Sequence, residues 1–169
     1  IDPHHSVDVE LLSTVKKGDQ LSSGKYIAVP TIADLVERAG ARSVIAAAKT
    51  VGLLLDRQFG IGALSAHDGI PSDGKRKAAA ALNNRVTLFT GQCLPSAALD
   101  PITEKLSSFP SAHLQQDSWT TKALIDVLWN DGVPAFSILW LGEPDLTEHE
   151  TAPGAPAALA AIKSADENL

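Results

Sequence analysis

One segment near the C-terminal end organises the chain, and it reads Phe136-Ser-Ile-Leu-Trp-Leu-Gly-Glu-Pro-Asp-Leu-Thr-Glu-His149. It begins with a mostly apolar run from Phe136 to Leu141. The short length of this run, with its aromatic and β-branched residues, favours a buried strand over a helix. Gly142 and Pro144 then interrupt the pattern and end the strand. The segment therefore predicts a short buried strand followed by a turn.

Two side chains with metal-binding chemistry follow this turn. Asp145 and His149 are four residues apart, about one turn of a helix, so in a turn or helix start their side chains lie on one side. A carboxylate and an imidazole suit zinc or a similar divalent ion. Ligands of open α/β sheets also collect at the carboxyl ends of strands. By spacing alone, a solvated surface pair is the default interpretation, and the metal site is the alternative.

Helical and strand patterns alternate through the rest of the chain, which is typical of an α/β fold. Helices are predicted over residues 30–40, 100–106, 117–132 and 156–166, and strands over residues 43–48, 86–90 and 136–141.

Two of these helices have clear local signals. In the helix over 30–40, Thr31 is the expected N-cap and Gly40 the expected end. In the helix over 117–132, Asp117 or Ser118 is the expected N-cap. The spacing of apolar residues predicts one buried face on each helix. These faces are Ile32, Leu35, Val36 and Ala39 in the first helix, and Ala123, Leu124, Val127 and Leu128 in the second.

Composition limits the class of protein. The chain has 169 residues, enough for one domain with a hydrophobic core. Its formal net charge of −6 argues against a nucleic-acid-binding surface. No apolar stretch reaches the roughly 18 residues that a membrane helix needs, and no signal peptide is visible. The single cysteine, Cys93, excludes an internal disulfide and is predicted to be a buried, inert thiol.

Two stretches lack clear periodicity. Residues 1–26 are polar and are predicted to be irregular, with His4 and His5 exposed or part of a tag. Residues 57–84 are rich in Gly, Asp, Ser and Asn and are predicted to form loops. Within these loops, His67 and Asp68 stand beside turn residues, which favours a turn over a pair of metal ligands.

The segment after the predicted strand also resembles a family motif. The string Trp140-Leu-Gly-Glu-Pro-Asp-Leu-Thr-Glu-His149, followed by Ala152-Pro-Gly154, is similar to the E-P-D-x-x-x-H…G-P segment of one enzyme family. That family is the type I phosphodiesterase/nucleotide pyrophosphatase branch of the alkaline phosphatase superfamily. The resemblance covers most of residues 28–169. It implies an alkaline-phosphatase-like mixed sheet flanked by helices, and it makes residues 1–169 part of a single catalytic domain.

The resemblance assigns roles to three residues, and the position of a fourth, Glu143, suggests another. In the family, the Asp and the His of the motif bind one of two catalytic metal ions, usually zinc, which implies that Asp145 and His149 are metal ligands. A family helix and strand that lead into a Lys-containing stretch are similar to residues 30–56, which implies that Lys49 can face the active cleft. A salt-bridged or snorkelling lysine is the alternative for Lys49. Glu143, beside the ligands, is expected to have a structural role or to support them.

The implied reaction is metal-assisted hydrolysis of a small phosphate ester. A typical family member has its nucleophile upstream of the region that matches residue 1, and further metal ligands downstream of the region that matches residue 169. Thr90-Gly91 is similar to a Thr-Gly pair that follows the nucleophile in the family. This pair occurs in the wrong order relative to the other motifs, so Thr90 is not assigned as the nucleophile. We therefore expect part of a longer enzyme that is inactive alone and needs the remainder of its own chain or a partner chain. A non-catalytic binding or structural module that retains the scaffold is the alternative.

Overall fold

The computed structural model describes residues 8–23, 26–27, 29–56 and 85–169. Within these residues the core is a four-stranded sheet of order β3-β2-β1-β4. The strands are β1 (Ser43–Ala47), β2 (Arg85–Phe89), β3 (Gln92–Leu94) and β4 (Phe136–Trp140). β1 pairs in parallel with both β2 and β4, whereas β3 pairs antiparallel with β2. The fold is therefore mixed α/β, as the sequence predicts.

The central strand, β1, is buried along its whole length. Its register aligns Ser43 with Arg85 on one side and with Phe136 on the other. A strand that is covered on both faces needs a continuous apolar run, which the sequence supplies from Val44 onward. β4 lies at the edge of the described sheet and is only half-buried. The prediction of a fully buried strand at this position is therefore wrong.

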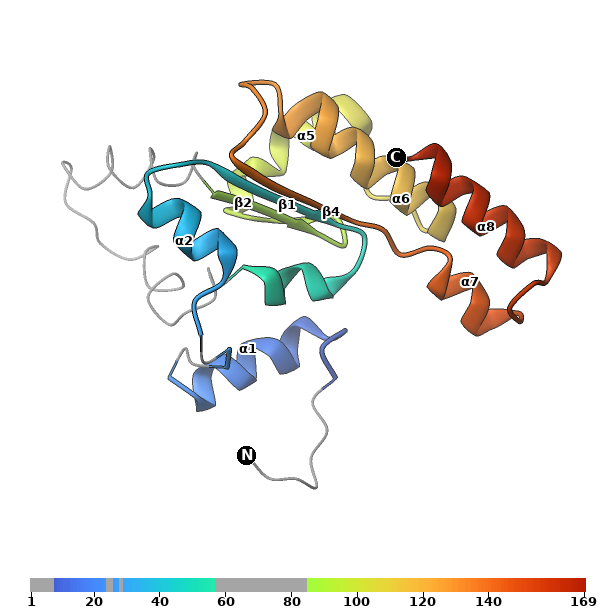
Figure 1. The fold of residues 1–169 in the computed structure, drawn as a ribbon, viewed down its shortest axis with the longest axis horizontal. Helices are drawn as coiled ribbons and strands as arrows, with labels where there is room; N and C mark the ends of the chain where they lie inside the picture. Colours follow the sequence, from blue (N-terminus) through green and yellow to red (C-terminus); the bar gives the residue numbers. More distant parts are fainter. Residues whose placement is uncertain (1–7, 24–25, 28, 57–84) are drawn as a thin grey trace.

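Helices cover both faces of the sheet (Figure 1). One face carries α5 (Asp100–Leu106) and α6 (His113–Lys122), which continues as a π-helical segment, η4 (Ala123–Leu128). The other face carries α2 (Ile32–Arg38) and a 3-10 helix, η1 (Thr50–Leu55), with α1 (Leu12–Leu21) below them. The main core cluster lies between the sheet and the α5–α6 layer. Its buried members are Val44, Ala46, Val86, Leu88, Cys93, Ile102, Trp119, Ala123, Leu124 and Leu128.

Two helices extend beyond the carboxyl ends of the parallel strands. α7 (Asp145–Glu150) follows β4 after a short turn, and α8 (Pro156–Glu167) then returns along α6 (Figure 1). Ala158 and Ala161 are the buried residues of α8. Their small side chains allow the close helix approach, while Leu159 and Ile162 remain exposed. Among the described residues, no helix is long and apolar enough to span a membrane.

A buried ionic network joins the second helical layer to the sheet. Arg85, at the start of β2, forms ion pairs with Asp34 and Glu37 of α2, at 2.9 Å and 2.7 Å, and with Asp56 after η1. Asp56 also accepts a hydrogen bond from the Thr87 hydroxyl. Burial raises the pKa of Asp34, but hydrogen bonds from Thr31 and Arg85 outweigh it and hold that pKa below its usual value.

Several predictions of local structure are confirmed. The three predicted strands agree with β1, β2 and β4 to within one residue, and the helices over 30–40, 100–106 and 156–166 appear as α2, α5 and α8. Thr31 caps α2 through a reciprocal capping box with Asp34. Cys93 is buried in β3, and burial raises its pKa to about 12.

Others are wrong. The N-terminal segment is not irregular throughout, because residues 12–21 form α1. The long helix begins at His113, so neither Asp117 nor Ser118 is its cap. On α2 the buried residue is Ala33, whereas Ile32 and Leu35 are exposed, because α2 contacts β1 through its smallest side chain. The predictions for His4, His5, His67, Asp68 and the loops over residues 57–84 lie outside the described residues.

Candidate functional site at the carboxyl ends of β1 and β4

The sheet order places a topological switch point where β1 and β4 end. β2 lies on one side of β1, and the chain then crosses to the opposite side to form β4. In open α/β sheets such a reversal of direction leaves room for a ligand beyond the carboxyl ends of the strands. The residues that follow the two strands, Lys49 after β1 and Gly142 to Asp145 after β4, meet at this point.

Lys49 and Asp145 form an ion pair between the segments that follow β1 and β4. The Lys49 ammonium group donates a hydrogen bond to Asp145 Oδ2. The Lys49 side chain is 16% exposed and that of Asp145 is 57% exposed, so the lysine is held between the elements while the carboxylate faces solvent. The hydrogen bond from Lys49 holds the pKa of Asp145 below its usual value, and the charges of Lys49 and His149 add to this effect.

His149 lies on the same side of α7 as Asp145, as the four-residue spacing predicts. Its Nε2 atom is 3.4 Å from Asp145 Oδ1, and its side chain is 79% exposed. Two ligands at about 2.0–2.1 Å from a tetrahedral zinc ion are themselves about 3.3 Å apart. The separation of the two donor atoms is compatible with a shared zinc ion, and it is equally that of a direct contact between the imidazole and the carboxylate.

The fit to a metal ion is otherwise incomplete. Among the described residues, no group of three or more His, Cys, Asp or Glu side chains is arranged to hold a metal. Catalytic zinc sites in proteins use about three protein ligands and a water molecule. Asp145 and His149 therefore supply two donors, and the second oxygen of Asp145 is already paired with Lys49.

Glu143 is turned away from these donors and caps α7. Its side chain is buried, and its two oxygens accept hydrogen bonds from the Thr147 backbone N–H at 3.0 Å and from the Thr147 hydroxyl at 2.9 Å. These contacts satisfy a donor in the first turn of the helix. His113 Nδ1 lies 3.9 Å from Glu143 Oε1 and brings a titratable group close to this buried carboxylate.

Asp117 is a part of the site that sequence reasoning missed. Its carboxylate is 1% exposed and accepts hydrogen bonds from the backbone N–H groups of Gly142 at 2.6 Å and Glu143 at 2.9 Å. Burial raises the pKa of Asp117, and these two hydrogen bonds oppose the rise. The spacing of residues along α6 could have predicted that Asp117 is buried. Asp117 lies one helical turn before Thr120, Thr121 and Leu124, on the same buried face.

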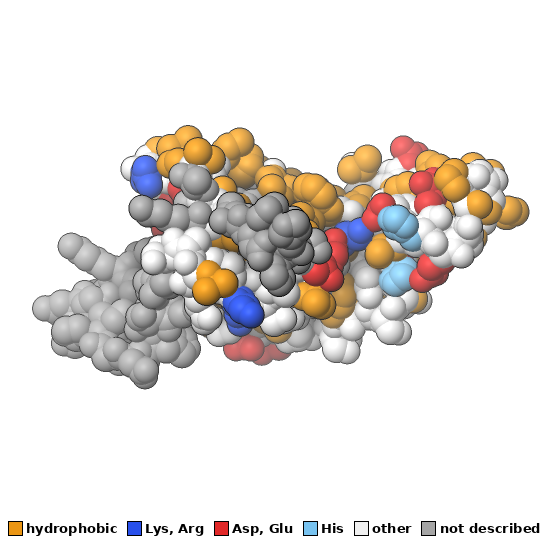
Figure 2. Space-filling model, turned by 90° about the horizontal axis from the view of Figure 1, so that it is seen from below, with side chains coloured by type: hydrophobic (Ala, Val, Ile, Leu, Met, Phe, Trp, Pro, Cys, Tyr) orange, Lys and Arg blue, Asp and Glu red, His pale blue; other side chains and the backbone are white. Residues whose placement is uncertain are grey.

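The site residues gather on one surface of the molecule. Figure 2 shows histidine, acidic and basic side chains side by side at one end, beyond the sheet. The exposed or partly exposed residues of this group are Lys49, His113, Asp145, His149 and Glu150, and the buried Glu143 lies beneath His113.

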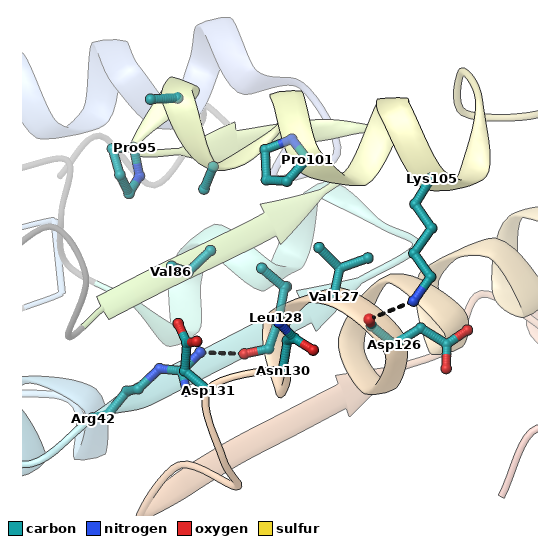
Figure 3. Close-up of a pocket in the computed structure, with 12 residues that line it drawn as sticks. Arg42, Val86, Pro95, Pro101, Lys105, Asp126, Val127, Leu128, Asn130 and Asp131 are labelled. Atoms are coloured by element: carbon teal, nitrogen blue, oxygen red, sulfur yellow. Dashed lines mark hydrogen bonds between the residues drawn. The ribbon is translucent and has the colours of Figure 1, made fainter.

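A separate cavity lies on the opposite side of the sheet's centre, toward the amino ends of the strands. It has a volume of about 660 Å³ and lies between β2, α5 and η4 (Figure 3). Its two cationic side chains are used to bind backbone carbonyls near the end of η4. Arg42 donates to the carbonyls of Leu128 and Gly132, and Lys105 to that of Asp126. These contacts stabilise the helix end and include none of the candidate site residues.

Comparisons of the chain with protein-family models, with curated proteins and with solved structures give no match.

Proposed function

We propose that the chain binds a divalent metal ion, with zinc the expected one, through Asp145 and His149, as part of a metal-dependent hydrolase of phosphate esters. The phosphodiesterase/nucleotide pyrophosphatase type of the alkaline phosphatase superfamily is the class that its motif resembles. The observation that supports this proposal is the 3.4 Å separation of Asp145 Oδ1 and His149 Nε2 beyond the carboxyl end of β4.

The chain's own residues have distinct roles in this proposal. Asp145 and His149 hold the ion, and Lys49 orients the Asp145 carboxylate through its ion pair. A bound divalent ion supplies activation of water and neutralisation of charge that develops on phosphate oxygens. The further ligands and the nucleophile come from beyond the described residues.

Metal titration of the purified protein tests the ligand assignment. We expect zinc to bind with measurable heat in isothermal titration calorimetry, and Asp145→Ala and His149→Ala each to weaken binding more than about tenfold. Glu148→Ala is the matched control, because Glu148 is an acidic residue of the same helix outside the pair. Wild-type affinity in both ligand variants contradicts the assignment.

Hydrolysis is tested separately with bis-p-nitrophenyl phosphate and added zinc or manganese. The assay requires the longest chain that the gene encodes, because the proposal places the nucleophile beyond the described residues. A metal-dependent rate that Asp145→Ala abolishes supports the hydrolase. Full activity of Asp145→Ala, or no hydrolysis by that protein, contradicts it.

The ion pair itself favours a second candidate, a non-catalytic binding or structural module. Lys49 already balances the charge of Asp145, so the carboxylate has a partner without any metal. In this case zinc gives no binding heat and the longest chain hydrolyses no phosphodiester. Zinc binding that depends on Asp145 excludes this candidate.

A further inference from the structure

The geometry points to Asp117 as a positioning residue, which fixes the backbone between β4 and α7 and thereby sets the position of Asp145 and His149. The part of this inference that concerns metal affinity rests on the proposed function. The part that concerns the position of α7 does not.

Asp117 is suited to this role because it belongs to the rigid core. It lies on α6 next to Trp119 and Thr120, which are both buried between the helix and its neighbours. Its two hydrogen-bonded partners, the N–H groups of Gly142 and Glu143, lie 25 and 26 positions later in the chain. A carboxylate that accepts two backbone N–H groups holds both of them in one orientation. Asp117 therefore connects the core directly to the turn that precedes α7.

Glu143 carries this constraint into α7. Its backbone is held by Asp117, and its side chain binds both the N–H and the hydroxyl of Thr147. Thr147 lies midway between Asp145 and His149 in the sequence. A continuous series of hydrogen bonds thus runs from α6, through Glu143, to the helical turn that carries the two candidate ligands.

The packing around Gly142 leaves this turn little freedom. A Cβ atom added at Gly142 would lie 3.0 Å from Leu146 Cδ1 and 3.5 Å from Asp117 Oδ1. The backbone at Gly142 therefore lies directly between Asp117 and the first turn of α7. An added Cβ atom would be in ordinary contact with Asp117 Oδ1 and tight only against the end of the Leu146 side chain.

Asp117→Asn is the principal test, because asparagine has nearly the same size but faces one of the two N–H groups with its own amide NH₂. Two readouts are needed. The first is the set of backbone amide resonances of residues 142–149 in ¹⁵N NMR spectra recorded without metal. The second is zinc affinity from calorimetry. We expect Asp117→Asn to shift those resonances and to weaken zinc binding about tenfold or more.

Ile102→Val is the control for loss of stability alone. Ile102 is buried in the core between α5 and the sheet, away from α7, so its shortening lowers the melting temperature without changing the resonances of residues 142–149. Thr147→Val provides a second variant should Asp117→Asn fail to fold. It removes one hydrogen bond to Glu143 and leaves α6 unchanged, and we expect smaller shifts confined to α7.

The outcomes separate the two proposals. The positioning role is overturned if the resonances of residues 142–149 stay unchanged in Asp117→Asn. If only Thr147→Val folds, the same result in that variant overturns it. Zinc that fails to bind the wild-type protein overturns the metal site, while the NMR comparison still tests Asp117. Shifted resonances together with wild-type zinc affinity also overturn the inference, because Asp117 would then position α7 without affecting the ligands.

Discussion

The ammonium group of Lys49, which follows the central strand β1, pairs with the carboxylate of Asp145 at the start of α7, 96 positions later in the chain. This contact joins two segments that the sheet brings together and that the sequence keeps far apart. It also favours the ionised form of a candidate metal ligand, because Lys49 is the main cause of the lowered pKa of Asp145.

Replacing Lys49 by methionine is therefore expected to raise the pKa of Asp145 toward its usual value of 3.8. In the wild type the folded pKa is lower than the unfolded one, so the pair contributes stability above the unfolded pKa and loses it as the pH falls through the folded pKa. The ¹³C NMR titration of the Asp145 carboxyl carbon measures the change. Lys163→Met, which removes an exposed ion pair with Glu167, is the control and should leave the Asp145 titration unchanged.

Replacing Gly91 by alanine is expected to destabilise the protein strongly. Gly91 has a φ of +71° in the turn between β2 and β3, and an added Cβ atom would lie 2.4 Å from Phe109 Cβ. Gly40 has a similar φ of +74° but no atom within 4 Å of an added Cβ, so Gly40→Ala isolates the cost of the backbone conformation, about 1 kcal/mol. Urea denaturation should show a larger loss for Gly91→Ala, and equal losses would contradict the overlap with Phe109.

The buried network around Arg85 should be costly to break. Arg85→Met removes the guanidinium group that pairs with the buried carboxylate of Asp56, and we expect a loss of about 3 kcal/mol in the free energy of unfolding. Glu37→Gln removes the most exposed partner of the same arginine and should cost less than about 1 kcal/mol. Denaturation curves of both variants test the difference, and a loss for Arg85→Met as small as that for Glu37→Gln would refute it.

Cys93 should be unreactive in the folded protein. Burial raises its pKa to about 12, so almost no thiolate is present at mildly alkaline pH, and the sulfur is also shielded from reagents. We expect slow labelling by Ellman's reagent under native conditions and rapid labelling in denaturant. Rapid native labelling would show that β3 opens readily or that the thiol is exposed.

The parts of the fold that the sequence predicts are those specified by local chemistry. The apolar run of β1 and the Thr31 cap of α2 are examples, since each depends on residues close together in the chain. α1 was missed because its N-cap, Leu11, provides no side-chain hydrogen bond and because Gly18 interrupts its interior. That helix depends on contacts of Leu12 with the cluster around Leu53, which only the folded chain provides.

The same distinction applies to the candidate site. The proximity of the Asp145 and His149 side chains was predictable, since residues four positions apart lie on the same side of a helix. The role of Asp117 was not predictable. An aspartate near the start of a helical pattern is usually interpreted as an N-cap, whereas the hydrogen-bond partners of Asp117 are Gly142 and Glu143, which follow β4. Distant partners of this kind are determined by the strand order, which no short motif contains.

The strand order also determines when the site can assemble during synthesis. Of the four described strands β1 emerges from the ribosome first, but its second neighbour, β4, emerges last, after β2, β3, α5 and α6. Until then one edge of an apolar strand has no partner strand, and Lys49 has no Asp145 with which to pair. The sheet and the site are therefore completed in the same late step, and a nascent chain that ends before Phe136 has neither.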